Sequence, residues 1–545
     1  MKPKTSPAEL IAHWPLSSDF ENVANDSLSI TNHNVELLQQ TAHFNGLDSY
    51  LEIPNHPDLN WGCGDFSISV CIETDALCDV VGDIISKFDS GARRGWTLNV
   101  VTNSGVTSTA QSNYRHLHFG MDNGAPVAAW RDCGRPGNAT YIYSLATIGG
   151  VLYAGTFEKA ADESGHLWRY EGDEKWIHCG ATPDGSNATP SVIGFDGAVY
   201  CSTGRFNSAG SCLGPPQNTA PGGHVYRIEA DGKWIDCGKP GGEDAVPEST
   251  PTTGFDTGKA DSVSALTVYR GRLYATSFHR RGVFVYEGGQ KWKSIGLPER
   301  LMTFTVYRDQ LYALVNGGPV YRYDGGENWT HCGTPSNSIQ TYAAATYKGD
   351  LLVGTWRGCE VVRYDGGEQW TSFGRAGFEM EVMAMALYNA KVYFGTLPMG
   401  NVWRLDDGNY QYIANLDNSP EAYLRRVWSM AIYQGKLFAG TLPSGRVLSF
   451  EAGRMASHDT ALPGGRHHVA AVRDGSNLRL YLNGKQVAQS SSFDAADFDL
   501  SNDQNLKIGF GPHQYFKGTM SDLRLYHCAL EEREIQRLSA SANTA

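Results

Sequence analysis

A strand pattern repeats along the middle of the chain, and this repetition constrains the fold more than any other feature. Each unit has an apolar strand, a glycine turn, a second strand of the Leu-Tyr-Ala-Gly-Thr type, a third strand and a turn before a tryptophan. The second strand recurs around Tyr153, Tyr200, Tyr274, Tyr312, Leu352, Tyr393 and Phe438. Most copies are 38 to 47 residues apart, the length of a four-stranded propeller blade.

The outermost strand of most units carries a tryptophan, but the last unit ends at Phe450 without one. A matching segment, Ala-Ala-Trp-Arg-Asp-Cys-Gly with Trp130, precedes the first complete unit. We predict that the strand around Trp130 completes the last unit. This pairing would close a ring of seven blades and remove the open edge of the sheet.

Composition narrows the class of protein. A chain of 545 residues is too long for a single core. Its many glycines and aromatic residues favour short strands with tight turns, so we expect an all-β fold. The net charge of −13 argues against a nucleic-acid partner, and the longest apolar runs are too short to span a membrane. The first residues lack the apolar core of a signal peptide, so we expect an intracellular protein, or a secreted or periplasmic one whose signal has been removed.

Two turns of the repeat have a recognisable form. Tyr-Asp-Gly-Gly-Glu-Asn-Trp at 323–329 and Tyr-Asp-Gly-Gly-Glu-Gln-Trp at 364–370 resemble the Asp-box turn of sialidases. Arg322 and Arg363 stand where that turn usually has serine. The resemblance implies a folding turn on the outside of a blade and no chemistry.

The two ends of the chain show a different pattern. Alternating strands at 44–54, 66–73, 83–88 and 95–100 resemble the first half of a laminin-G-like, concanavalin A-like jelly roll, and 465–488, 505–510 and 516–535 resemble its second half. We therefore predict an all-β chain in which a seven-bladed β-propeller is inserted into a LamG-like sandwich. The predicted boundaries are residues 1–122 for the first half of the sandwich, 123–452 for the propeller and 453–545 for the second half.

One acidic residue of the sandwich has two interpretations. Asp522 lies where domains of this kind often place a metal ligand or a structural aspartate. The resemblance implies either a structural role or a bound calcium ion. No cofactor is expected for catalysis.

Loop residues of the repeat indicate where a ligand would bind. We expect the loops at one face of the propeller to gather arginine and aromatic side chains, which suit an anionic saccharide because guanidinium groups match carboxylates and aromatic rings pack on sugars. The predicted catalytic residues are His279, Tyr342, Arg280, Arg205 and Arg357. The predicted substrate-binding residues are Trp356, Trp428, Tyr143, Tyr423, Arg281 and Arg425.

Blade number and residue types resemble the seven-bladed polysaccharide lyases that act on ulvan and on rhamnose–glucuronate linkages. That resemblance implies β-elimination of a uronate, with His279 as the base, Tyr342 as the acid (Tyr143 and Tyr423 are alternatives) and an arginine that neutralises the carboxylate. A glycoside hydrolase using Glu379 and Glu381 is the first alternative. A sialidase-like enzyme and a non-catalytic lectin or adhesin are the others.

Overall fold

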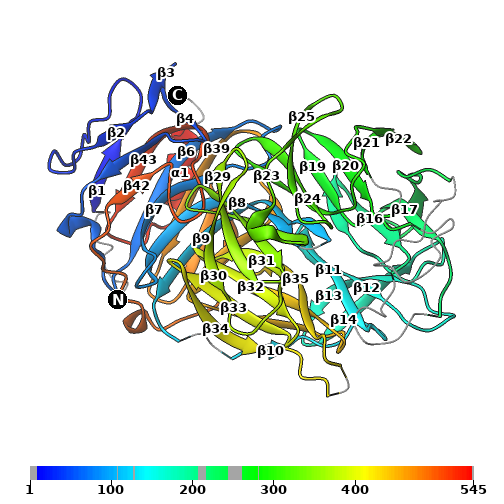
Figure 1. The fold of residues 1–545 in the computed structure, drawn as a ribbon. Coiled ribbons are helices and arrows are strands. Elements are labelled where there is room, and N and C mark those ends of the chain that lie inside the picture. The colour runs from blue at the N-terminus through cyan, green and yellow to red at the C-terminus, as the bar shows by residue number, and fades with distance from the viewer. Residues whose placement is uncertain are drawn as a thin grey trace.

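The computed structural model describes residues 9–106, 108–126, 129–206, 217–243, 261–279, 282–420 and 422–542. The fold is all-β, and the one α-helix among these residues is α1 (Glu532–Ala542). Short 3-10 turns lie at Pro57–Leu59, Pro335–Asn337 and Ala495–Asp497. Figure 1 shows the strands of the two chain ends on one side of the molecule and the repeated units on the other.

The repeated units are built from antiparallel strands that pair in sequence order, and three of them form separate four-stranded sheets. These are β15 (Val192–Phe195), β16 (Ala198–Gly204), β17 (Gly222–Ile228) and β18 (Trp234–Asp236); β19 (Leu266–Tyr269), β20 (Arg272–Ser277), β21 (Gly282–Gly288) and β22 (Lys291–Ser294); and β23 (Leu301–Tyr307), β24 (Gln310–Val315), β25 (Val320–Gly325) and β26 (Asn328–His331).

Other units follow the same order but are joined to a neighbouring sheet. A bridge between Trp356 and Glu381 links two of them into one eight-stranded sheet. Its strands are β27 (Gln340–Tyr347), β28 (Asp350–Trp356), β29 (Glu360–Gly366), β30 (Gln369–Arg375), β31 (Glu381–Tyr388), β32 (Lys391–Leu397), β33 (Asn401–Asp406) and β34 (Asn409–Asn415). The unit nearest the N-terminus consists of β11 (Tyr141–Ile148), β12 (Val151–Phe157), β13 (His166–Gly172) and β14 (Lys175–Ala181).

The ring is closed by a strand from the start of the repeat region. The last unit contains β35 (Arg426–Tyr433), β36 (Lys436–Leu442) and β37 (Val447–Phe450), and its fourth strand is β10 (Arg131–Asp132). Arg131 pairs with Ser449, and the Trp130 ring packs 4.3 Å from the Phe450 ring. The predicted pairing of this strand with the last unit is therefore confirmed.

A Trp-x-x-Cys sequence recurs in the outer strands, and hydrogen bonds from its tryptophan join neighbouring units. The indole Nε1 of Trp176 donates to the carbonyl of Cys133 at 2.8 Å, and Trp234 donates in the same way to Cys179 at 3.1 Å. Equivalent bonds join Trp292 to Cys237 and Trp370 to Cys332. Each tryptophan thus satisfies a carbonyl of the preceding unit, and the small cysteine leaves room for the indole.

Arg322 and Arg363, which stand where the Asp-box turn usually has serine, bond to the aspartate of their own turn. Arg322 Nε donates to Asp324 at 2.9 Å, and Arg363 Nε donates to Asp365 at the same distance. The arginine and the threonine that directly follows the tryptophan both donate to each carboxylate, as Thr371 does to Asp365 at 2.6 Å. These bonds hold the turn closed at the solvent edge of the unit.

The two chain ends form one sandwich. One sheet contains β1 (Leu10–Trp14), β3 (Glu36–Leu38), β4 (Thr41–Asn45), β6 (Phe66–Thr74), β39 (Gly465–Arg473), β40 (Leu478–Leu482), β41 (Lys485–Gln489) and β43 (Lys517–Tyr526). The facing strands are β2 (Thr31–His33), β5 (Tyr50–Ile53), β7 (Gly82–Asp89), β8 (Arg94–Val106), β9 (Thr109–Asn123), β38 (Arg454–Ala461) and β42 (Leu506–Ile508).

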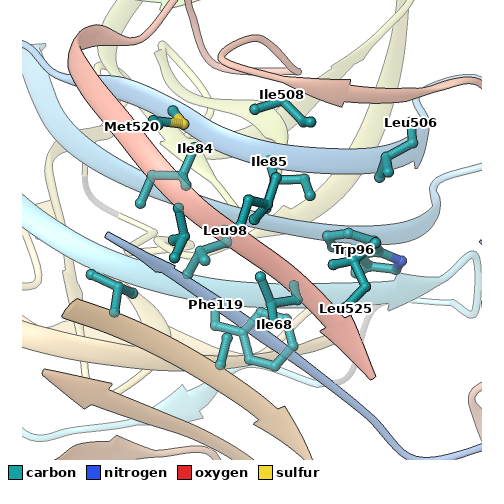
Figure 2. Packing of buried hydrophobic residues seen from close by; sticks show 14 of the residues in the cluster. Ile68, Ile84, Ile85, Trp96, Leu98, Phe119, Leu506, Ile508, Met520 and Leu525 are labelled. Atoms are coloured by element: carbon teal, nitrogen blue, oxygen red, sulfur yellow. The ribbon is translucent and has the colours of Figure 1, made fainter. Parts of the chain in front are cut away.

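Strands from the two ends alternate within both sheets. β6 pairs with β39 along its whole length, β4 pairs with β43, and β42 lies between β5 and β7. Figure 2 shows the resulting core, in which Ile68 and Trp96 from one end meet Leu506 and Met520 from the other. The predicted union of the two ends is confirmed at this level of strand pairing, and neither end can bury its sheet alone.

A long β-hairpin of the sandwich extends through the centre of the ring. The predicted strand at 95–100 is only the base of β8, which continues to Val106 and returns as β9. Together, β8 and β9 contact the innermost strands β11, β15, β19, β23, β27, β31 and β35 (Figure 1). A hairpin that touches all of these strands occupies the central channel.

Side chains of the hairpin bond to backbone that lines the channel. Gln111 both donates to the carbonyl and accepts from the amide of Val268, each at 2.8 Å. Asn113 makes the same two bonds with Ile432, at 2.7 and 2.9 Å. Asn103 accepts from the amide of Leu387. These bonds satisfy backbone groups that would otherwise be buried without partners.

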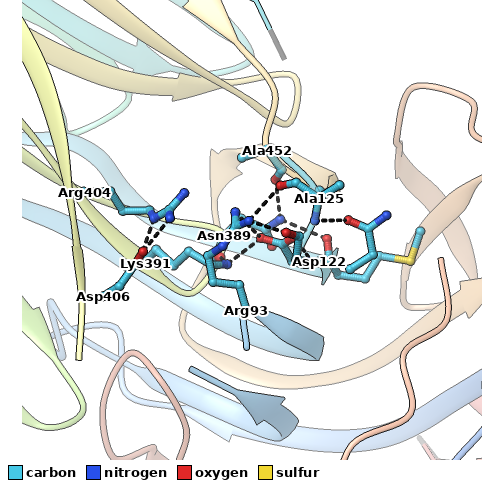
Figure 3. A network of polar contacts seen from close by, with 12 residues as sticks. Arg93, Asp122, Ala125, Asn389, Lys391, Arg404, Asp406 and Ala452 are labelled. Atoms are coloured by element: carbon cyan, nitrogen blue, oxygen red, sulfur yellow. Dashed lines mark hydrogen bonds and ion pairs between the residues drawn. The ribbon is translucent and has the colours of Figure 1, made fainter. Parts of the chain in front are cut away.

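A buried ion pair joins the base of the hairpin to the ring. Lys391 on β32 is 1% exposed, and its Nζ lies 2.6 Å from Asp122 Oδ2 at the end of β9. Asn389 donates to the carbonyls of Met121 and Ala452 beside this pair. Figure 3 shows the network, with Arg93 also facing Asp122. The sandwich is therefore fastened to the ring at the turn side of its inner strands.

Candidate functional site

The candidate site lies at the entry face, which we define as the end of the ring at which the inner strands β11, β23, β31 and β35 begin. This end is opposite the turns that contact the sandwich. An apolar cluster lies here, with Tyr141, Tyr143, Met302, Tyr342, Met383 and Trp428 among its buried members and Phe206, Phe278 and Leu424 packed against it. The cluster brings together the segments that carry the residues predicted from the sequence.

The tip of the channel hairpin forms the floor of this cluster. Trp428 Nε1 donates to Ser108 Oγ at 3.2 Å. The Trp428 ring lies 4.9 Å from Tyr141, 5.4 Å from Tyr143 and 6.2 Å from Tyr342. Trp428 is 3% exposed and Tyr143 is 4% exposed, so these rings act as a packed base beneath the face. Burial raises the pKa of the Tyr143 phenol.

The backbone amides of two predicted catalytic residues are held by one aspartate that the sequence interpretation missed. Asp261 is fully buried; its carbonyl accepts from the amide of Arg205 at 3.0 Å, and its Oδ1 accepts from the amide of His279 at 3.1 Å. Ser277 Oγ donates to Oδ2 at 2.7 Å. Asp261 therefore brings the segments of Arg205 and His279 side by side. Asp261 follows the long segment that separates the units of Tyr200 and Tyr274. It has no counterpart in the repeat, so the sequence pattern could not identify it.

Tyr342 and Glu381 form a second polar group on the floor. Asn316 Nδ2 donates to the Tyr342 hydroxyl at 2.5 Å. Burial, with the nearby Glu381 carboxyl, raises the pKa of Tyr342 well above its ordinary value. Burial also raises the pKa of Glu381 to about 8, and the Arg426 guanidinium partly offsets this rise. At neutral pH Glu381 is thus predominantly a neutral acid.

Guanidinium groups surround this floor. The Arg426 guanidinium carbon lies 5.7 Å from the centre of the Trp428 ring, and that of Arg300 lies 4.1 Å from the centre of the Phe278 ring. Arg205, Arg425 and Arg426 are half-buried, whereas Arg357 is exposed. Positive charge therefore lies both within the floor and above it.

The remaining predicted binding residues lie around the rim. The Arg357 guanidinium carbon is 5.7 Å from the Trp356 ring, and Trp356 is half-buried. Arg425 donates its amide to the carbonyl of Pro398 at 3.0 Å. Tyr423 is 70% exposed. Arg280 and Arg281 lie outside the described residues.

Glu379, the partner of Glu381 in the hydrolase alternative, is tied to its surroundings. Asn401 Nδ2 donates to Glu379 Oε1, and the amide of Met399 donates to Oε2 at 3.4 Å. Burial raises the pKa of Glu379, and these hydrogen bonds oppose the rise. Glu379 therefore has fixed partners, whereas Glu381 Oε1 is buried and accepts no hydrogen bond from the described residues.

Asp522 lies in the sandwich, far along the chain from these residues. Its Oδ1 accepts from His13 Nε2 at 2.8 Å and from the Arg524 guanidinium at 2.9 Å. Both partners lower the pKa of Asp522. Within the part of the chain that the structure describes, no group of three or more histidine, cysteine, aspartate or glutamate side chains has the arrangement of a metal site. Both interpretations of Asp522, a structural role and a bound calcium ion, stay predictions.

A comparison with protein families agrees with the architecture of the sandwich. The family model described as the concanavalin A-like lectin/glucanases superfamily, Laminin_G_3, matches residues 428–536. The sandwich is a concanavalin A-like LamG domain, and the ring is a β-propeller. The family match begins within β35, whereas the strands of the LamG domain resume only at β38. A search of curated proteins finds no match to the sequence.

Solved propellers overlap with the chain at low similarity. The WD40 β-propeller domain of Doa1 is 11% identical and covers 59% of this chain and 97% of its own, with a TM-score of 0.39. YCF48 from Cyanidioschyzon merolae is 11% identical and covers 59% and 99%, also with a TM-score of 0.39. The description of the ring therefore rests on the strand pairings given above. No described helix has the length and apolar character needed to cross a membrane.

Proposed function

We propose that the protein is carbohydrate-active and that the entry face of its propeller binds and cleaves an acidic polysaccharide. The observation that carries the proposal is the ring of arginines (Arg205, Arg357, Arg425 and Arg426) around a desolvated aromatic floor that contains Glu381 and Tyr342. The chain as a whole has a net charge of −13, so a local excess of guanidinium groups favours an anionic ligand.

Cleavage by β-elimination fits the residue types at this face. An arginine, Arg205 or Arg357, neutralises the uronate carboxylate and so acidifies the hydrogen on C5. His279 takes that proton, the electron pair forms the C4–C5 double bond, and the C4–O bond breaks. The departing oxygen receives a proton from an acid on the floor, for which Tyr342 is the residue proposed from the sequence.

Glu381 is the better donor of that last proton. Its pKa of about 8 leaves it protonated at neutral pH, yet makes it a far stronger acid than a phenol whose pKa has been raised by burial. We therefore assign the acid role to Glu381 and propose that Tyr342, held by Asn316, orients the substrate or relays the proton.

The protonated side chain of Glu381 also fits the hydrolase alternative, and this single observation keeps that alternative open. Two carboxyl groups flank the bond in such enzymes, one protonated and one ionised. Glu381 meets the first requirement. The hydrogen bonds of Glu379 to Asn401 and Met399 make that residue a less available second group.

Three further features belong to the proposal. We infer seven blades from the succession of four-stranded units between β10 and β37, with the eight-stranded sheet counted as two blades. The boundaries at residues 122 and 452 and a calcium ion at Asp522 stay predictions. A lectin or adhesin function would use the same face without cleavage.

The decisive experiment is a screen of acidic polymers, namely polygalacturonate, alginate, hyaluronate and ulvan, followed by ultraviolet absorbance of the C4–C5 unsaturated product. A rise in absorbance supports the lyase. Reducing ends without that absorbance would replace it with a hydrolase, and retention without any product would replace it with a lectin. Glu381→Gln keeps the shape of the side chain and is expected to remove the proton donor, whereas Glu368→Gln, on an exposed outer turn, is the matched control.

A further inference from the structure

A cavity lies in the propeller unit formed by β11 to β14, away from the entry-face residues. It has a volume of about 310 Å³ and is lined by Asn138, Glu158, Glu163, His166, Trp168 and His178. This volume is at the lower end of the range for small-molecule sites, about 300 to 1000 Å³. None of the arginines of the proposed polysaccharide site lines it.

Gly137 permits the arrangement of the cavity wall. Its φ of +52° lies in the left-handed region, and a Cβ at this position would come within 2.5 Å of the Trp168 ring. Any other residue would displace the indole. The Trp168 ring also packs 4.8 Å from His178. Trp168 is therefore wedged between a glycine and an imidazole.

Two buried polar atoms in the cavity wall have no partner among the described residues. Glu158 is 1% exposed; its Oε1 accepts from Thr156 Oγ1 at 3.0 Å, but its Oε2 accepts no hydrogen bond. Trp168 Nε1 is likewise buried without an acceptor. Buried polar groups are nearly always satisfied, and each orphan costs about 1–3 kcal/mol. A ligand that supplied both partners would relieve this cost.

Several other polar atoms of the wall already have partners. His166 Nδ1 and His178 Nε2 lie 2.9 Å apart, so one donates to the other. Asn138 Nδ2 donates to Glu163 Oε1 at 3.1 Å. The ligand chemistry is therefore set by the Glu158 carboxyl and the Trp168 indole N–H.

Charge further limits the class of ligand. Burial raises the pKa of Glu158 to about 8, so the group is predominantly protonated at neutral pH. Burial and the neighbouring His178 lower the pKa of His166, which favours a neutral imidazole pair. No lysine or arginine lines the cavity, and the Arg135 guanidinium, which acts on Glu158 from outside the lining, has the smallest influence on its pKa, so the cavity wall favours a neutral ligand over an anion. An ammonium group has no acceptor for the indole N–H.

We propose that this cavity is a second binding site, which takes a neutral saccharide unit through its hydroxyl groups. A hydroxyl both accepts and donates, so one or two of them can satisfy Trp168 Nε1 and Glu158 Oε2 together. The flat indole suits the apolar face of a sugar ring. The site does not depend on the chemistry proposed for the entry face.

The test is calorimetric titration of the full-length protein with methyl glycosides of neutral hexoses, pentoses and deoxyhexoses. We expect at least one to bind, and we expect Glu158→Leu and Trp168→Phe each to weaken it by about ten-fold or more, because each removes one hydrogen bond and leaves its partner unsatisfied. Glu171→Leu, on an exposed part of β13, is the matched control and should bind as the wild type does.

Variants at the entry face separate the two sites. Arg357→Gln should leave binding of the neutral glycoside unchanged, whatever it does to acidic polymers. The proposal is overturned if no neutral glycoside binds, if both cavity variants bind as tightly as the wild type, or if a simple alkylammonium ion binds more tightly than any sugar.

Discussion

The entry face and the cavity beside Trp168 each contain a buried glutamate whose pKa burial raises to about 8, yet their surroundings differ. Glu381 lies near the Arg426 guanidinium, which pulls its pKa back down. Around Glu158, a threonine hydroxyl donates to the carboxyl and lowers its pKa, another glutamate raises it, and the Arg135 guanidinium has the smallest effect, a lowering. At both sites the strands determine how deeply the glutamate is buried, whereas the loop residues determine the charge around it. The comparison implies an anionic ligand at one site and a neutral ligand at the other.

The two sites also differ in what supports them. The floor of the entry face includes Ser108 at the tip of the LamG domain's hairpin, which accepts a hydrogen bond from Trp428 of the propeller. The cavity beside Trp168 is lined only by residues 137 to 178 of the propeller. A change that destabilises the sandwich should therefore disturb the entry face before it disturbs the cavity beside Trp168.

The largest effect is expected from removing residues 453–545. Strand β39 would be lost from its place beside β6, and β43 from its place beside β4 and β6. Each remaining sheet face would expose its apolar side, so the sandwich should unfold completely. Circular dichroism and limited proteolysis of the truncated chain measure this. A stable, protease-resistant fold of residues 1–122 would contradict the pairing of the two ends.

His279→Ala should lower turnover on an acidic polymer by about two to four orders of magnitude, the usual contribution of a positioned acid or base. The amide that bonds Asp261 is retained in this variant, so the segment of Arg205 should keep its place. Initial rates and thermal melting are measured on the same preparation. Full activity of the variant would remove His279 from the mechanism and favour the hydrolase alternative.

Asp122→Ala should destabilise the fold by about 3–5 kcal/mol, because it leaves the Lys391 ammonium buried without its counter-ion. The matched control is Asp173→Ala, which breaks an exposed pair with Arg131 and should cost far less, because solvent screens that pair. Urea denaturation gives both values. Equal costs for the two variants would show that the network in Figure 3 does not fasten the domains.

A smaller effect concerns pH. Between about pH 5 and pH 8 the folded protein keeps a proton on Glu381 that the unfolded chain has released, so this group makes the free energy of unfolding fall as pH rises. Glu381→Gln should abolish that part of the slope and raise stability at pH 8 relative to the wild type. Thermal melting of both proteins across this range checks it. Parallel curves would mean that the Glu381 carboxyl ionises normally.

The architecture could be predicted because its signals are local and repeated. Each unit carries its own second strand and tryptophan, and Trp130 supplies the missing outer strand. The hairpin in the channel could not be predicted, because residues such as Gln111 and Asn113 alternate like those of any exposed strand. Their partners, Val268 and Ile432, lie more than 150 residues away.

Prediction of the site was partial for a similar reason. Arginine and aromatic residues stand out against an acidic chain, so the sequence predicted the segments of Arg205, His279, Tyr342 and Trp428 as site segments, but it could not show that Trp428 is buried beneath the face. Asp261 was missed as a site residue because a single carboxylate carries no signal in the sequence until the fold shows what it contacts.

The most direct test of the account is a pair of binding measurements on three proteins: the wild type, Arg357→Gln/Arg425→Gln and Glu158→Leu. Each is titrated with a uronate oligosaccharide and with the neutral methyl glycoside that the wild type binds. The account predicts that the arginine variant loses about ten-fold or more in affinity for the uronate alone, and that Glu158→Leu loses as much for the neutral sugar alone. Uronate binding that survives in the arginine variant, or that falls in Glu158→Leu, would contradict it.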